Sequence, residues 1–167
     1  MTTMHQGVRI GVDVGNARVG VAASDPAGTF ALPVATLTRD VEHGSDLDEV
    51  AALVTGRQAV GVVVGLPLLL SGEEGAAARL ARSYAAEVAK RVRPVPVRLV
   101  DERLTTVDAH RRLRDSGVPG RGQRAVVDQA AAALILQVAL DAETRSGEPA
   151  GEMVSSARKP RKKAPPR

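Results

Sequence analysis

Three acidic residues lie at positions where an isolated charge is costly to bury. Asp13 ends one apolar segment, Glu102 ends another, and Asp128 lies within an otherwise apolar stretch. Buried carboxylates need either basic partners or a shared cation. Asp and Glu oxygens suit Mg²⁺ or Mn²⁺, and such ions catalyse the hydrolysis of phosphodiester bonds. We therefore interpret the three acids as ligands of one catalytic metal site.

Each of these acids also has a simpler interpretation. Asp13 could accept hydrogen bonds from the backbone of the turn that follows it. Glu102 could be a solvated residue paired with Arg103. Asp128 could form an exposed ion pair with Arg124, one helical turn away. The sequence alone leaves these alternatives open, and the metal interpretation requires that all three acids converge.

Apolar patterns predict the elements that carry these acids. We expect strands at 8–15, 18–25, 30–38, 59–67 and 97–102. We expect helices at 45–56, from 71 to about 91, from 105 to about 117 and from 124 to 142. This order predicts an α/β fold, in which a mixed five-stranded sheet carries helices on its faces. Ligands gather at the carboxyl ends of strands in such sheets, where Asp13 and Glu102 are expected.

Single residues refine this prediction at the element boundaries. Pro33 cannot donate a backbone hydrogen bond, so the third strand should lie at a sheet edge. Ser45 or Asp46 is expected to be the N-cap of the first helix. Ser71 and Glu74 have the spacing of a capping box for the second helix.

Length and composition limit the possible classes of protein. With 167 residues the chain has room for one well-buried core. The absence of Cys excludes disulfides, thiolate zinc sites and a cysteine nucleophile. The N-terminus has no apolar segment typical of a signal peptide, and no apolar run reaches the roughly 18 residues of a membrane span. We expect one domain in a soluble, cytoplasmic protein that is not bound to a membrane.

Charge is distributed unevenly along the chain. The formal net charge is +4, but the segment from Ser155 to the C-terminus holds six Lys or Arg and no acid. The remainder therefore has 17 basic against 19 acidic residues. A Pro- and Lys-rich segment of this kind favours disorder and nonspecific attraction to polyanions. Overall basicity is thus no argument that the folded part binds nucleic acid.

Arginines near the acids and in one later segment could contact phosphates. The segment RRLRDSGVPGRGQR, residues 111–124, holds five arginines against one acid. The arginines that we expect to bind a nucleic-acid backbone are Arg18, Arg103, Arg111, Arg112, Arg114, Arg121 and Arg124. Arg18 and Arg103 could instead pair with the acids near them, and the other five could be solvated. With one Phe, one Tyr and no Trp, the chain offers few stacking surfaces, so recognition should depend on backbone charge and shape.

Four segments resemble the sequence blocks of a known family. They read DVGNARVGVAASD, VVVGLPL followed by SGEEG, VDERLTTVDA, and VDQAAAALILQ. They are similar to the YqgF family, also called RuvX, whose members are proposed as Holliday junction resolvases and as nucleases that mature the 5′ end of pre-16S ribosomal RNA. The resemblance spans about residues 8–142. It implies a ribonuclease H-like fold, active-site acids at Asp13, Glu102 and Asp128, and a divalent metal, Mg²⁺ or Mn²⁺.

The resemblance also sets expectations for domains, mechanism and partners. We expect a nuclease domain over 7–144, a disordered N-terminus over 1–6 and a disordered basic tail over 145–167. Water activated by metal would attack the phosphate, with Asp13 bridging two ions about 4 Å apart. The partner would be pre-16S rRNA or branched DNA, and the protein would act as a monomer or a homodimer.

Two other functions remain open from the sequence. DVGN and the following RVGVAASD also resemble the first phosphate loop of sugar kinases and actin-like ATPases, which usually pair two such domains around a nucleotide. Alternatively, the chain could be a non-catalytic module that binds ribosomal RNA or branched DNA and whose acids serve only solubility.

Overall fold

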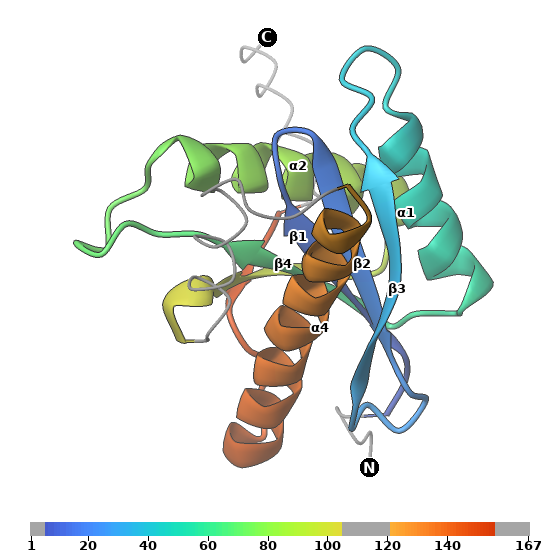
Figure 1. Ribbon diagram of the computed structural model, residues 1–167. Helices are drawn as coiled ribbons and strands as arrows, with labels where there is room; N and C mark the ends of the chain where they lie inside the picture. The colour runs from blue at the N-terminus through green and yellow to red at the C-terminus, as the bar shows by residue number, and fades with distance from the viewer. Residues whose placement is uncertain (1–5, 105–120, 156–167) are drawn as a thin grey trace, which may run out of the picture.

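A six-stranded mixed sheet forms the centre of the structure, a computed structural model that describes residues 6–104 and 121–155 (Figure 1). Its strands in chain order are β1 (Arg9–Val14), β2 (Arg18–Ser24), β3 (Ala31–Thr38), β4 (Gly61–Leu66), β5 (Val97–Asp101) and β6 (Glu152–Met153). They are arranged in the order β3-β2-β1-β4-β5-β6. β4 runs parallel to both β1 and β5, and the other neighbours are antiparallel. The predicted α/β class is confirmed.

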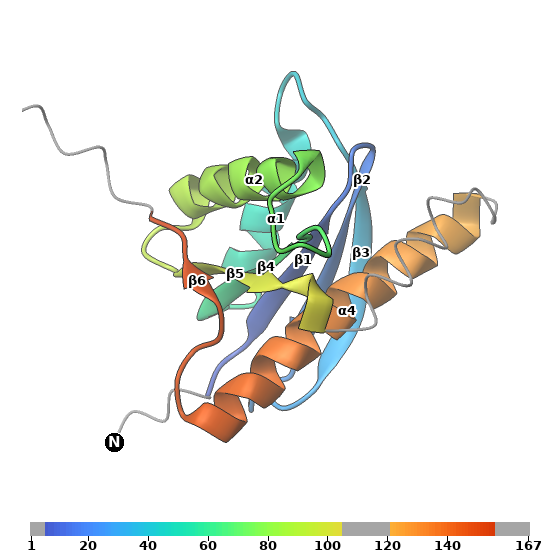
Figure 2. The ribbon, with the colours of Figure 1, turned by 90° about the vertical axis from the view of Figure 1, so that its left-hand side faces the viewer.

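Helices cover both faces of this sheet. They are α1 (Ser45–Gly56), α2 (Ala76–Val92) and α4 (Arg121–Ser146), with a short 3₁₀ turn, η1 (Glu102–Leu104), after β5. α1 and α2 lie side by side on one face, and α4 crosses the other face, as the two ribbon views agree (Figures 1 and 2). The helix expected from 105 to about 117 lies outside the described residues.

The observed order of the strands agrees with the residue composition of each strand. β1 and β2 form the expected antiparallel hairpin. β3 is an edge strand, as Pro33 predicts, and Pro33 faces Ala22 where the register shifts after Val21. β4 is buried at every position and lies between two parallel neighbours, which suits its continuous run of apolar residues. β1 and β5 are therefore separated only by β4, and their carboxyl ends lie near each other.

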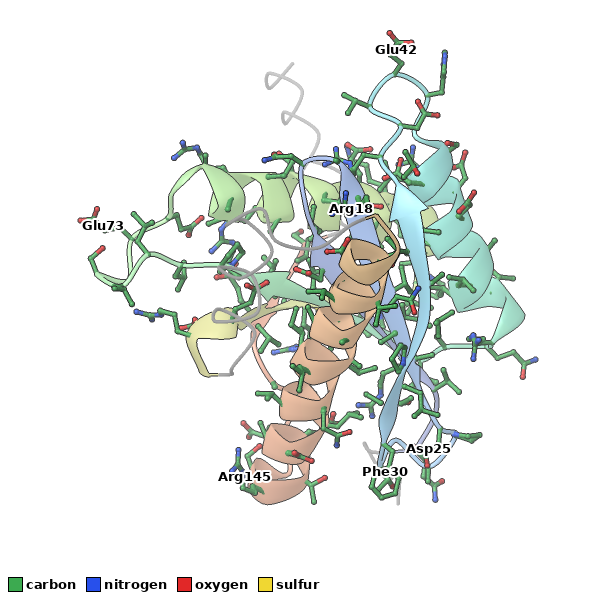
Figure 3. All side chains as sticks on the ribbon, viewed as in Figure 1. Arg18, Asp25, Phe30, Glu42, Glu73 and Arg145 are labelled. Carbon is green, nitrogen blue, oxygen red and sulfur yellow. The ribbon has the colours of Figure 1, made fainter. Side chains whose placement is uncertain are left out.

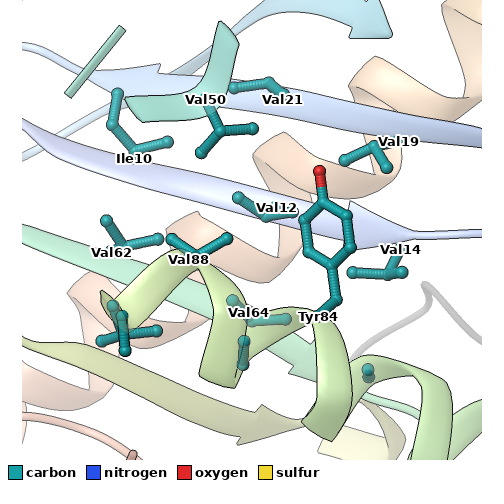
Figure 4. Close-up of a cluster of buried hydrophobic side chains, with 14 of the residues drawn as sticks. Ile10, Val12, Val14, Val19, Val21, Val50, Val62, Val64, Tyr84 and Val88 are labelled. Carbon is teal, nitrogen blue, oxygen red and sulfur yellow. The ribbon is translucent and has the colours of Figure 1, made fainter. Parts of the chain in front are cut away.

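The face that packs on α1 and α2 is built mainly from valine. Alternate residues of β1, β2 and β4 point into this layer and meet side chains of both helices; among those labelled in Figure 4 are Ile10, Val12, Val14, Val19, Val21, Val50, Val62, Val64, Tyr84 and Val88. β-Branched residues pack well on a pleated surface, so this layer is a conventional hydrophobic core.

The face that packs on α4 is built differently, with glycines where side chains would otherwise stand. A Cβ added at Gly11 would lie 2.7 Å from Leu136 Cβ, and one at Gly20 would lie 2.0 Å from the backbone oxygen of Asp128. A Cβ at Gly65 would lie 2.6 Å from Ile135 Cδ1. These distances are far shorter than a van der Waals contact. The helix backbone thus approaches the sheet more closely than any side chain on these strands would permit.

The far end of α4 is fixed by a buried ion pair. Arg9 of β1 donates to Glu143 of α4 through Nη1 at 2.5 Å and Nη2 at 3.2 Å, and both residues are buried.

By length and composition alone, residues 125–146 of α4 could also cross a membrane, although no membrane span was expected from the sequence. The helix packs along the sheet and carries two buried acids, Asp128 and Glu143. These features fit a core helix of the folded domain rather than a membrane span.

Two predictions about the C-terminal part were wrong. We expected five strands and a folded domain ending at 144, with a disordered tail from 145. Instead, α4 continues to Ser146, and residues 152–153 add β6 beside β5. Arg82 of α2 holds this strand by hydrogen bonds to Glu152. That contact joins residues 70 positions apart, so no local sequence pattern predicts it. Residues 1–5 and 156–167 lie outside the described part, where the expectation of disorder stays a prediction.

The predicted helix starts were also displaced. α2 begins at Ala76 behind Gly75 and has no side-chain cap, so the expected capping box of Ser71 and Glu74 does not form. Ser71 instead accepts a hydrogen bond from the backbone N–H of Glu73 within the preceding loop. The N-cap position of α1 is Gly44 rather than Ser45 or Asp46. In both cases a glycine occupies the N-cap position, and the polar side chains expected there form hydrogen bonds with other residues.

Substitution of Gly20 by Ala should destabilise the protein by about 3 kcal/mol or more, the upper end for overpacking, because the added methyl group meets rigid backbone of α4. Gly56→Ala is the matched control. A Cβ there meets nothing within 4 Å at the end of α1, so the change should be neutral or stabilise by up to about 1 kcal/mol. Urea unfolding of both variants measures the effect. Equal free energies of unfolding would contradict the close helix approach.

Candidate active site

The three predicted acids all lie on the α4 side of the sheet. Val12 and Val14 point toward α1 and α2, so Asp13 between them points toward α4. Val100 packs against α4, and Glu102 lies on the same side, because a Cβ added at Gly65 would meet both Glu102 Oε1 and Ile135 Cδ1 of α4. Asp128 lies on α4 itself, one helical turn before Ala131 and Ala132, which are buried against the sheet. All three are nearly inaccessible, with 1 to 2% of their surface exposed.

Glycines bring the three acids toward one region. Asp13 pairs with Gly20 across the β1–β2 hairpin, and Gly20 is the residue over which the Asp128 backbone lies. On the other side of β1, the pairing of Val12 with Val64 places Gly65 beside Asp13. A Cβ at Gly65 would lie 2.4 Å from Glu102 Oε1. Asp13 therefore lies between Gly20, which the backbone of Asp128 approaches, and Gly65, which the side chain of Glu102 approaches.

Asp128 forms an ion pair with Arg18. From the sequence, Arg18 was expected only to contact phosphate or to pair with the acids near it. Arg18, the first residue of β2, donates from Nε to Asp128 Oδ2 at 2.7 Å. Its side chain is 30% exposed, whereas that of Asp128 is 2% exposed. Figure 3 shows Arg18 beside the first turns of α4. The partner expected from helical spacing, Arg124, has a side chain outside the described part.

The donor set fits a hard divalent cation. Carboxylate oxygens are the ligands that Mg²⁺ and Mn²⁺ prefer, and Gly20 and Gly65 allow Asp128 and Glu102 to approach the strand that carries Asp13. Within residues 6–104 and 121–155, however, no three acidic, His or Cys side chains are already grouped to hold an ion. The predicted metal site therefore stays a prediction.

Arg103 pairs with a different acid from the one that its position suggests. It donates from Nη2 to Asp101 Oδ2 at 2.8 Å, and both side chains are partly exposed. This guanidinium lowers the pKa of the Asp101 carboxyl below its usual range. The predicted alternative, a pair with Glu102, is replaced because Glu102 turns inward while Asp101 and Arg103 remain at the surface.

The other predicted phosphate contacts are only partly covered by the structure. Arg111, Arg112 and Arg114 lie outside the described residues. Arg121 and Arg124 belong to the first turn of α4, but their side chains also lie outside what is described. The proposed arginine patch therefore stays a prediction.

A buried network that the sequence analysis missed supports the turn between β1 and β2. Arg39 donates from Nη1 to Gly15 O at 3.2 Å and from its backbone N–H to Ala17 O. Its Nε lies 3.6 Å from Asp46 Oδ2, which also accepts a hydrogen bond from the Tyr84 hydroxyl at 2.9 Å. The sequence suggested Asp46 only as a helix cap. Its burial in α1 could not be inferred because its partners come from the residue after β3 and from α2.

Comparison with known proteins places this architecture in a family. A model of the family described as "RuvX: Holliday junction resolvase" matches residues 7–142. The chain belongs to the RuvX family. This confirms the resemblance drawn from the sequence and favours the nuclease over the ATPase-like and non-catalytic alternatives.

Relatives in this family are highly similar over most of the chain. A protein of Frankia casuarinae is 59% identical over 85% of this chain and 70% of its own length. One of Kineococcus radiotolerans is 54% identical over 95% of this chain and 84% of its own. One of Thermobifida fusca is 52% identical over 90% and 98%. Each carries the name "Putative pre-16S rRNA nuclease".

Two solved structures that are similar to this chain are of RuvC. RuvC of Thermus thermophilus in complex with a Holliday junction substrate aligns with a TM-score of 0.54 and 15% identity, over 86% of this RuvX-family chain and 99% of the RuvC chain. A second RuvC structure aligns with a TM-score of 0.50. At this identity the likeness concerns the fold alone. It confirms the predicted ribonuclease H-like architecture.

Tyr84 should make the stability of this RuvX-family protein decrease at alkaline pH. Burial, and then the hydrogen bond to Asp46, raise the pKa of its hydroxyl well above the usual value. The folded state therefore retains the proton more tightly than the unfolded chain. This contribution is complete below about pH 10 and is lost as pH rises above it. Tyr84→Phe should remove that loss while costing about 1 kcal/mol at neutral pH.

Urea unfolding of wild type and Tyr84→Phe between about pH 7 and pH 11 measures this effect. Tyr84 is the single tyrosine of the chain, so the difference between the two curves isolates its ionisation. Parallel curves over the alkaline range would contradict a hydroxyl that is buried against Asp46.

Proposed function

We propose that this chain is a divalent-metal-dependent nuclease that processes the 5′ end of pre-16S ribosomal RNA in the cytoplasm. The observation that carries the proposal is the position of three buried carboxylates, Asp13, Glu102 and Asp128, on the α4 face of the sheet. Buried acids are costly, and a shared catalytic cation explains why a stable fold retains three of them on one face. Relatives more than 50% identical carry the name of an rRNA nuclease.

Each acid has a definite part in this proposal. Bound Mg²⁺ or Mn²⁺ would activate the attacking water and stabilise the leaving oxygen. Asp13 lies between the approaches of the other two acids, so it would be the central residue of the set that holds the metal. Glu102 and Asp128 would each complete one side. Their burial would strengthen the interaction of the carboxylates with those cations.

Arginines would position the nucleic-acid backbone against these acids. Arg18 and Arg103 lie beside the site, at the start of β2 and in η1, and both side chains are partly exposed. Arg111, Arg112, Arg114, Arg121 and Arg124 complete the proposed phosphate-binding set. Charge from arginine is independent of base identity, so selectivity would come from the shape of the RNA.

Branched DNA is the second candidate substrate. It is favoured by the family description, which names a Holliday junction resolvase. The same three acids would serve both reactions, since each is a phosphodiester hydrolysis. A four-way DNA junction therefore belongs beside the RNA in every assay.

Replacement of any one of the three acids by its amide should abolish cleavage. Asp13→Asn, Glu102→Gln and Asp128→Asn should each lower the rate on a pre-16S RNA fragment by at least about 100-fold, because the amide cannot balance the charge of the metal. Asp141→Asn, on the exposed side of the same helix as Asp128, is the matched control and should cleave like wild type. Unchanged cleavage by the three amide variants would contradict the proposal.

Removal of divalent metal should stop the reaction reversibly. Wild-type protein treated with chelator should cleave neither RNA nor junction, and added Mg²⁺ or Mn²⁺ should restore cleavage of the physiological substrate. Gel analysis of both labelled substrates in parallel identifies which one is cut. Cleavage that persists in chelator would exclude metal-assisted hydrolysis, and faster cleavage of the junction would reverse the choice of substrate.

A further inference from the structure

An exposed apolar loop follows β4 at the edge of the sheet where the proposed active site lies. β4 ends at Leu66, and residues 67–75 connect it to α2. Leu69 and Leu70 in this loop are 51% and 81% exposed, and the second value is the highest among the large hydrophobic side chains in the described residues. Exposure of leucine to water is unfavourable, so two adjacent exposed leucines indicate a contact surface.

A tight turn fixes Leu70 at the tip of this loop. Gly72 N–H donates to Leu69 O at 2.7 Å and closes the turn, and Leu69 N–H donates to Glu73 O at 2.9 Å. Gly72 has a φ of +90°, a conformation that favours glycine. Leu69 also packs on the backbone before α2, where a Cβ added at Gly75 would lie 3.4 Å from Leu69 Cδ2. The backbone of the turn therefore holds the Leu70 side chain in solvent.

The loop lies beside residues of the proposed active site. It begins just after Gly65, where an added Cβ would lie 2.4 Å from Glu102 Oε1. At the turn itself, a Cβ added at Gly72 would lie 3.4 Å from Arg103 Nη1. Figure 2 shows the loop between α2 and η1. The exposed leucines are therefore neighbours of Arg103, which is one of the proposed phosphate contacts.

A nucleobase is the partner that best fits this surface. The loop contains Glu73 and Glu74 and no basic residue, so it cannot attract a phosphate backbone by itself. Figure 3 shows Glu73 directed outward from the loop. Arg103 offers a positive charge beside Gly72, and Leu70 offers an apolar surface in the same turn. Because each nucleotide joins a phosphate to a flat apolar base, a cation next to an apolar side chain matches a nucleotide.

The two aromatic side chains of the chain cannot make this contact. Tyr84 is buried beneath α2, and Phe30 precedes β3 at the end of the hairpin opposite to Arg18, as Figure 3 shows. Aliphatic side chains also unstack bases when they insert between them. Leu70 can therefore serve at this site as aromatic residues serve in other proteins that bind single-stranded nucleic acid.

We propose that Leu70 contacts an unstacked base of the nucleic-acid substrate beside the proposed active site. The inference rests on the proposed function for the identity of the substrate, but it requires no bound metal. An apolar contact is similar for all bases, so substrate shape stays the main source of selectivity. Leu69 supports the contact by holding the turn against α2.

Binding of a labelled pre-16S RNA fragment in the presence of chelator tests this contact without cleavage. Leu70→Ser should raise the Kd about fivefold, at low and at high salt alike, because an apolar contact is lost and no charge changes. Leu70→Met retains an apolar side chain of similar volume and should stay within about twofold of wild type. Phe30→Ser removes an exposed apolar side chain at the other end of the sheet and should bind like wild type.

A fluorescent base analogue reports the unstacking independently of affinity. The fluorescence of 2-aminopurine rises when it leaves the base stack, and it would replace the adenines around the mature 5′ end in the same fragment. At saturating protein, wild type, Leu70→Met and Phe30→Ser should all raise the fluorescence. Leu70→Ser should bind the RNA with little or no rise.

A four-way DNA junction, titrated in parallel, identifies the kind of substrate whose base is contacted. An effect of Leu70→Ser on the junction alone keeps the contact and assigns it to DNA. Wild-type affinity and fluorescence in Leu70→Ser with both substrates would overturn the contact and leave the proposed function intact. A loss that disappears at high salt, or that Phe30→Ser shares, would also overturn it. If wild type binds neither substrate, the proposed function itself fails and the contact fails with it.

Discussion

The close approach of α4 to the sheet is the constraint on which the remaining features depend. At Gly11, Gly20 and Gly65 the helix occupies space that any larger residue would fill. This approach brings Asp128 over the β1–β2 hairpin and leaves the inward-turned acids of β1 and of the segment after β5 facing the same helix. The opposite face, with its valine layer, supplies most of the hydrophobic packing. One face of the sheet thus supplies most of the hydrophobic stability, and the other carries the acids of the proposed active site.

This division explains how the fold tolerates buried charge. The carboxylates at Asp13, Glu102 and Asp128 are nearly inaccessible, and like charges close together in a poorly solvated region repel. An apolar layer on the other face offsets that cost, and Arg18 neutralises one of the acids directly. At the far end of the same helix, Arg9 and Glu143 form a buried pair that needs no metal. α4 is therefore fixed to the sheet by electrostatic contacts at both ends.

Local patterns in the sequence predicted most of the sheet and the face that carries the acids. Alternation in β1 placed Asp13 opposite the valines, and the apolar surroundings of Asp128 identified it as unusual. Apart from the helix starts at Gly44 and Gly75, the features that escaped prediction depend on contacts between distant residues: β6 with Arg82, Asp46 with Tyr84, and Arg18 with Asp128. Their side chains look like ordinary surface or capping residues until the tertiary fold joins them.

The central claim is that Asp13, Glu102 and Asp128 together bind the catalytic cation. A crystal structure of the protein soaked with Mn²⁺, with anomalous scattering to locate the ion, tests it most directly. The account predicts manganese between these three carboxylates, beneath α4. Manganese bound only elsewhere, with the three acids unchanged, would contradict it.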